Sequence, residues 1–119
     1  MFNIYDKNEN QLGSIEDDGM LYDLSQSQIG NIDDSGSIYS VSGDRMAYFD
    51  GSSIYSNDGD RLGYLEGNSL YSNGGDQIAT FDGSWLCDAS GERTHRFDTD
   101  NASMVARFGS VLALGVLKL

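Results

Sequence analysis

The chain has 119 residues with a net charge of −12, 15 glycines, no proline and one cysteine. Its length corresponds to a single domain. Its lone cysteine excludes an internal disulfide or a cysteine-based zinc site, and its negative charge argues against nucleic acid as a partner. Residues 1–92 hold 3 basic and 17 acidic side chains, whereas residues 93–119 hold 4 basic and 2 acidic ones. The C-terminal part therefore differs in character from the rest.

From its first residues the chain repeats a unit of 16 or 17 residues. Each unit has an aliphatic residue and a tyrosine, a polar turn, a second short apolar stretch that ends in an acid, and another turn. The tyrosine slot holds Tyr5, Tyr22, Tyr39, Tyr55 and Tyr71, with Cys87 in the sixth unit. This length fits two short strands and two tight turns, and the dense glycine excludes helix. The sequence predicts an all-β domain of five or six hairpin petals over residues 1–100.

Alternation along the second strand of each unit assigns its two faces. A small residue recurs on one face, at Gly13, Gly30, Ala47, Gly63 and Ala79. Such a position indicates close approach, either at the crowded centre of a ring or under a neighbouring tyrosine ring. The apolar residue two positions later is predicted to be core, at Ile15, Ile32, Phe49, Leu65, Phe81 and Phe97.

The two ends of the repeat region each leave a strand without a partner, at residues 2–6 and 93–98. Pairing these strands would close a ring and remove its edges, so we expect the petals to surround an axis. Five hairpins are continuous in the chain and a sixth would be split between the ends, which leaves the petal count at five or six.

Residues 101–119 form an apolar segment that is predicted to be a short helix or strand. As a helix, it would carry one stripe at Met104, Phe108, Val111, Leu112, Gly115 and Leu119. We expect this segment to pack on the same domain by covering the open face of the ring, or else to associate with copies from other chains. Its charge-free run is too short to span a membrane.

The unit Ile54-Tyr55-Ser56-Asn57-Asp58-Gly59-Asp60-Arg61-Leu62-Gly63-Tyr64-Leu65, followed by the short apolar C-terminal segment, resembles the bacterial beta-flower proteins. In that family four or five β-hairpin petals surround an axis. The resemblance covers nearly the whole chain. It implies a fold and no established activity, and it lends no catalytic residues.

Two sets of residues are candidates for binding. One carboxylate recurs in each unit, at Glu16, Asp33, Asp50, Glu66, Asp82 and Asp98. In a closed ring these would form a negative circle that holds a cation or a basic partner, or they serve only to begin turns and keep edges soluble. The aromatic residues Tyr48, Tyr64 and Trp85 are typical of sugar-binding surfaces and of protein interfaces, although half-buried strand packing is the simpler interpretation.

No catalytic residues are predicted. Cys87 and His95 lie on neighbouring predicted strands, but a Cys–His nucleophile also needs a cleft and oxyanion donors, and a buried thiol is the simpler interpretation. No metal site or cofactor is predicted either, since the carboxylates are spread over the units.

These observations favour a non-enzymatic acidic binding or scaffold module that presents its turns to a basic protein surface. The alternatives are a carbohydrate or cation bound between petals, and homo-oligomer assembly through the C-terminal segment. The N-terminus shows no signal peptide, which favours the cytoplasm, and neither nucleic acid nor a membrane is an expected partner.

Overall fold

The computed structural model describes residues 1–117 and residue 119, and within them it contains twelve strands and one helix. No helix in this part of the chain is long and apolar enough to cross a membrane. The elements are β1 (Phe2–Asp6), β2 (Gln11–Ile15), β3 (Met20–Asp23), β4 (Gln28–Ile32), β5 (Ser37–Ser40), β6 (Arg45–Asp50), β7 (Ser53–Ser56), β8 (Arg61–Glu66), β9 (Ser69–Ser72), β10 (Gln77–Asp82), β11 (Trp85–Asp88), β12 (Arg93–Phe97) and α1 (Ala102–Ala113).

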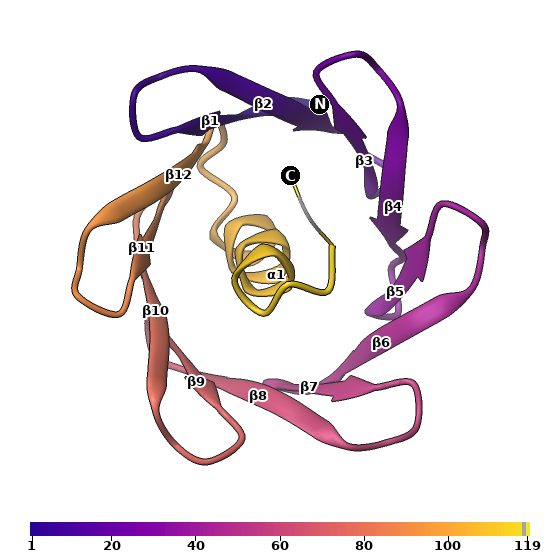
Figure 1. Cartoon of the computed structure of the whole chain (residues 1–119), viewed down its shortest axis with the longest axis vertical. Coiled ribbons are helices and arrows are strands. Elements are labelled where there is room, and N and C mark those ends of the chain that lie inside the picture. Colours follow the sequence, from indigo (N-terminus) through magenta and orange to yellow (C-terminus); the bar gives the residue numbers. More distant parts are fainter. Residues whose placement is uncertain (118) are drawn as a thin grey trace.

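The strands form a closed antiparallel barrel in which each pairs with its neighbours in sequence. The predicted closure is confirmed, because β1 pairs with β12 in the register Ile4↔Phe97. An ion pair reinforces this closure: Arg96 of β12 contacts the carboxylate of Glu9 at 2.6 Å. Glu9 lies in a left-handed conformation with φ 68°, which residues other than glycine seldom adopt. The molecule is a flat disc of 34 × 34 × 20 Å (Figure 1).

The strand connections alternate between the two ends of the barrel. Six four-residue loops point outward and form the tip rim: 7–10, 24–27, 41–44, 57–60, 73–76 and 89–92. Five strand connections at the other end form the turn rim together with the segment 98–101 that leads to α1: two of four residues, 16–19 and 33–36, and three of two residues, 51–52, 67–68 and 83–84. The outward loops define six petals, each a hairpin continuous in the chain. The expectation of a sixth petal split between the two ends was therefore wrong, because the end strands pair between two petals.

The change of period from 17 to 16 residues has its cause on the turn rim. In the first two units, the paired residues next to the turn are six positions apart in the sequence, as in Ile15↔Leu21 of β2 and β3. In the next three units the corresponding pair is one residue closer in sequence, as in Phe49↔Ile54. The first two turns therefore carry one extra residue each.

The core of the wall comes mainly from the aliphatic residue that precedes each tyrosine. These residues are at most 3% exposed: Ile4, Leu21, Ile38, Ile54, Leu70 and Leu86. The slot that the sequence favoured as core is mixed. Ile15, Ile32 and Phe97 are buried, whereas Phe49, Leu65 and Phe81 are only half-buried. These three residues pack against the core cluster but are not fully buried.

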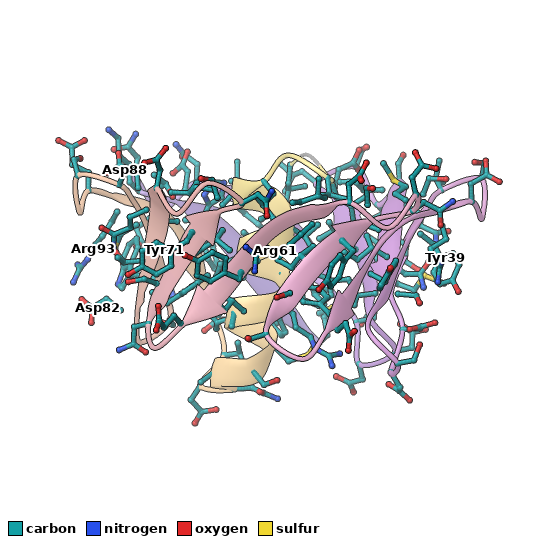
Figure 2. All side chains as sticks on the ribbon, turned by 90° about the horizontal axis from the view of Figure 1, so that it is seen from below. Tyr39, Arg61, Tyr71, Asp82, Asp88 and Arg93 are labelled. Atoms are coloured by element: carbon teal, nitrogen blue, oxygen red, sulfur yellow. The ribbon has the colours of Figure 1, made fainter. Side chains whose placement is uncertain are left out.

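The helix α1 lies inside the ring and does not cover one end of it (Figures 1 and 2), so the expected place of the C-terminal segment was wrong. Its buried residues are Val105, Phe108, Gly109, Ser110 and Val111. They do not form the single predicted stripe, because the wall surrounds the helix. The helix ends at Ala113, and Gly115 follows it with φ +76°, a common way to end a helix.

The neighbouring strand and the C-terminal tail after α1 together crowd three of the recurrent small residues, Gly13, Gly30 and Gly63. A side chain carbon added at Gly13 would lie 2.9 Å from Leu119, and one at Gly30 would lie 2.8 Å from Leu117. At Gly63 an added carbon would lie 3.5 Å from Leu114, which is an ordinary van der Waals contact. Of the two interpretations of these positions, the crowded centre of a ring is therefore the one that the structure shows.

We expect Gly30→Ala to destabilise the protein by about 1–3 kcal/mol, the usual cost of overpacking a well-filled core. The new methyl group would meet the Leu117 side chain at 2.8 Å and the carbonyl oxygen of Tyr39 at 2.5 Å. Gly74→Ala is the matched control, since its nearest neighbour is the Ser72 hydroxyl at 3.9 Å. Urea unfolding of both variants measures the difference; equal unfolding free energies would contradict the packing described.

Candidate functional site

All 19 acidic residues lie at the two ends of the barrel, either in a loop or on the strand residue beside it. The tip rim holds Asp6, Glu9, Asp23, Asp44, Asp58, Asp60, Asp76, Asp88 and Glu92, and the turn rim holds Glu16, Asp17, Asp18, Asp33, Asp34, Asp50, Glu66, Asp82, Asp98 and Asp100. Figure 2 shows Asp88 and Asp82 near opposite ends, with Arg61 and Tyr71 on the outer wall between them.

The tip rim is the less negative of the two, and several of its acids are part of the turns. Asp6, Asp23 and Asp88 each accept the N–H groups two and four residues later at 2.8–3.1 Å. The hydroxyl groups of Ser25 and Ser90 and the turn amides lower the pKa of Asp23 and Asp88. Lys7 lies in this rim, and three arginines begin strands beside it. These carboxylates mainly fix the backbone of the loops.

The structure places the six recurrent carboxylates on the turn rim, around the first turn of α1. They do not share one environment. Asp33 accepts hydrogen bonds within its own turn, with a lowered pKa caused first by the Ser35 hydroxyl. Asp82 lies 3.8 Å from Arg93, and Asp98 lies 3.9 Å from Arg96. Within the described residues no three His, Cys, Asp or Glu side chains converge as metal ligands would.

The carboxylates are most crowded in one patch of the turn rim, and the sequence predicted only some of its residues. We define the acidic sector as the two longer turns of the turn rim, with Glu16, Asp17, Asp18, Asp33 and Asp34. Asp17, Asp18 and Asp34 are exposed and were missed. A usable signal was present, because the extra residue of the 17-residue units gives each of these turns two adjacent aspartates.

The acidic sector borders the central helix. A small cavity of about 40 Å³ between the two turns is lined by Asp18, Asp34 and other sector residues, and by Arg107 and Phe108 of α1. The carboxylate of Asp17 also binds the N-terminal amino group at 2.6 Å. Even with these two cations nearby, the sector keeps an excess of negative charge.

The three aromatic candidates lie half-buried on the outer wall. An arginine guanidinium stands over each ring: Arg45 over Tyr48 at 4.8 Å, Arg61 over Tyr64 at 4.8 Å and Arg93 over Trp85 at 4.7 Å. Tyr48 and Tyr64 also stack on Tyr55 and Tyr71, at 5.4 and 5.3 Å. These contacts occupy ring faces that a sugar would need.

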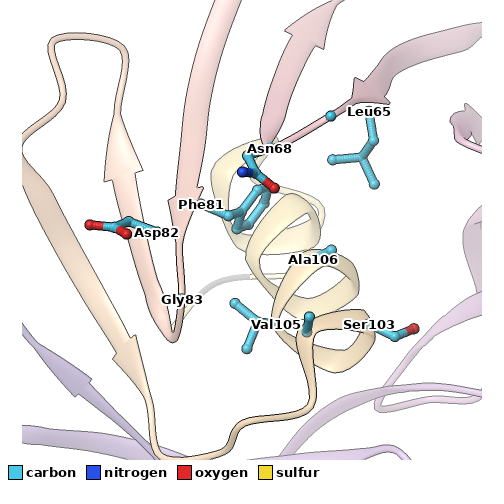
Figure 3. Close-up of a pocket in the computed structure, with 10 residues that line it drawn as sticks. Leu65, Asn68, Phe81, Asp82, Gly83, Ser103, Val105 and Ala106 are labelled. Carbon is cyan, nitrogen blue, oxygen red and sulfur yellow. The ribbon is translucent and has the colours of Figure 1, made fainter.

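A cavity of about 460 Å³ lies beside the first turns of α1 at the turn rim (Figure 3). Leu65 and Phe81 line it on the wall side, and Ala106 lines it on the helix. This space accounts for the incomplete burial of the two wall residues. Its polar groups come from the exposed turns, and no titratable pair converges in it.

Cys87 and His95 line a different cavity of about 230 Å³, at the other end of the helix. Cys87 is buried. Burial lowers the pKa of His95, although the charge of Asp6 on the neighbouring strand opposes this shift. Both residues depart from the repeat, since Cys87 replaces a tyrosine and His95 replaces a glycine or alanine, and both line this cavity.

A comparison with protein families matches residues 1–108 to a family described as 5-fold beta-flower protein. The matched range contains all twelve strands and the beginning of α1. No curated protein and no solved structure matched the chain. The family description counts five, whereas this chain forms six outward petals.

Proposed function

The chain belongs to the 5-fold beta-flower family, whose description names a fold and no activity, and we propose that it is a non-enzymatic binding module. In this proposal the acidic sector holds a basic segment of a protein partner. The observation that carries the proposal is the crowding of five carboxylates into two adjacent turns of one rim. Such a surface attracts lysine and arginine side chains and speeds their association.

Rigid turns support this role, because a prearranged site loses less entropy on binding. Inside the first turn Gly19 donates its N–H to the carbonyl of Glu16 at 3.0 Å, and Ile32 of β4 donates to the carbonyl of Gly19 at 3.1 Å. The second turn is tied to β6 in the same way, through Gly36 and Phe49 at 2.9 Å. The carboxylates are thus held on a fixed backbone.

The alternative functions have less support. Sugar binding would need ring faces that arginines now cover, and cation binding would need carboxylates that converge. Assembly through the C-terminal segment would require α1 to leave the ring, since Val105, Phe108 and Val111 are buried against the wall. These functions stay predictions.

The test is binding of a nona-arginine peptide, measured by fluorescence anisotropy at several salt concentrations. We expect the double variant Asp18→Asn, Asp34→Asn to bind about three- to tenfold more weakly, because each exposed ion pair contributes about 0.2–1 kcal/mol. The matched control is Asp58→Asn, Asp60→Asn, which removes the same charge from the tip rim.

The control should bind within about twofold of the unchanged protein, and added salt should weaken all binding by screening. Equal loss in both double variants would show attraction to the net charge alone and would overturn the proposed site. Binding that does not respond to salt would overturn the proposed chemistry.

A further inference from the structure

The small residues of the inner wall do not all face the same kind of neighbour. Three leucines of the C-terminal tail pack against small residues of β2, β4 and β8. The tail then runs toward β2 and β3, away from β10 to β12 (Figure 1). In front of Ala79 of β10 lies the cavity of about 230 Å³. At three equivalent positions, Gly13, Gly30 and Gly63, a leucine side chain of the tail lies in front of the small residue.

The lining of this cavity is mostly apolar. Ala79 and Leu86 line it from the wall, and Leu112 and Ala113 line it from the last turn of α1. Ligand pockets are typically apolar clefts with a few placed polar groups. The shape and lining favour a short aliphatic chain.

The polar edge of the cavity arises where the sixth unit departs from the repeat. Thr94 stands where the other units have leucine, isoleucine or methionine, and His95 stands where they have glycine or alanine. Both residues line the cavity. Two departures from the repeat therefore meet at one site.

The hydrogen bonds at this edge fix the form of the imidazole. The Thr94 hydroxyl donates its single proton to the carbonyl oxygen of Leu86 at 3.0 Å. The contact of 3.0 Å between Thr94 Oγ1 and His95 Nδ1 must then use the proton of Nδ1. In the neutral ring Nε2 is left as an acceptor, so the polar group of a ligand here would be a hydrogen-bond donor.

The negative charge around the cavity favours a positively charged hydrogen-bond donor over a neutral one. Asp88 lines the same cavity, Asp6 faces His95 across the β1–β12 pair, and the whole chain has a net charge of −12. We propose that this cavity binds a small primary amine with a short branched aliphatic chain, the chain in front of Ala79 and the ammonium group at Nε2 of His95. This inference is independent of the proposed function at the acidic sector.

The test uses three isosteric probes at equal ionic strength: 3-methylbutylamine, 3-methylbutan-1-ol and 3-methylbutanoate. Titrations followed by ¹⁵N–¹H correlation spectra should show saturable shifts at Ala79, Leu112 and Ala113, strongest for the amine and weakest for the carboxylate. Equal response to the amine and the carboxylate, or shifts confined to the acidic rims, would overturn the inference.

Two substitutions place a larger side chain in the proposed amine cavity, and a control substitution places one in the cavity at the other end of α1. Ala113→Leu should weaken the amine at least about tenfold, whereas Ala106→Leu, in the cavity at the other end of α1, should leave its binding unchanged. Thr94→Leu restores the residue of the repeat and is the second variant if Ala113→Leu does not fold; it should also weaken binding about tenfold. Undiminished binding in a folded cavity-filling variant would contradict the site.

Discussion

A chain that ends at Asp100 is expected to lose its cooperative fold. The deletion removes Val105, Phe108, Val111 and Leu117, which are at most 4% exposed. Burial of each such side chain contributes about 1.5–3 kcal/mol, so the four contribute about 6–12 kcal/mol. That sum is comparable with the whole stability of a typical domain, about 5–15 kcal/mol.

Near-UV circular dichroism of Trp85, urea unfolding and light scattering measure this loss. A chain that ends at Ala113 is the control, because it keeps α1 and removes only the tail; it should fold, with a lower unfolding free energy. A truncated chain that remains a folded monomer would contradict the role of α1 as core. An oligomer of the full chain that becomes a folded monomer on truncation would instead identify the segment as an assembly device.

The second large effect is expected from Phe108→Ala, at about 3–5 kcal/mol lost from the unfolding free energy. Phe108 is 1% exposed, and removal of a buried aromatic ring leaves a cavity that the wall cannot fill. Ser103→Ala on the exposed first turn of the same helix is the control and should change stability by no more than about 0.5 kcal/mol.

Chemical denaturation of both variants at one pH gives the comparison. If α1 only rested on the surface of the ring, Phe108→Ala would cost little more than Ser103→Ala. Phe108→Leu adds a graded test, since it keeps part of the volume and should lie between the two.

The ring was predictable because its signals are local. Tyr39, Tyr55 and Tyr71 repeat at a spacing that fits only two short strands, and glycine-bearing turns mark the end of each strand. The unpartnered end strands predicted closure. The position of α1 was not predictable in this way, because the inner width of a barrel depends on strand number and stagger together, and no local period encodes that width.

The candidate site was predictable only in part. The recurrent slot identified Glu16 and Asp33, but Asp17, Asp18 and Asp34 lie outside the repeat, in the extra length of two turns. The arginines over Tyr48 and Tyr64 were also missed. Each lies three residues before its tyrosine on the same strand, where simple alternation places the two side chains on opposite faces, and a register shift in the pairing of that strand breaks the alternation. The regular positions were found, and the extra residues of the two longer turns were not.

The most direct test of the account is whether α1 and the tail lie inside the ring. A nuclear Overhauser spectrum of the full chain should show contacts from the Phe81 ring to the α protons of Gly109, and from the Leu117 methyl groups to the α protons of Gly30. Those contacts join the helix and the tail to opposite parts of the wall. Helix contacts confined to residues of one rim would contradict the account.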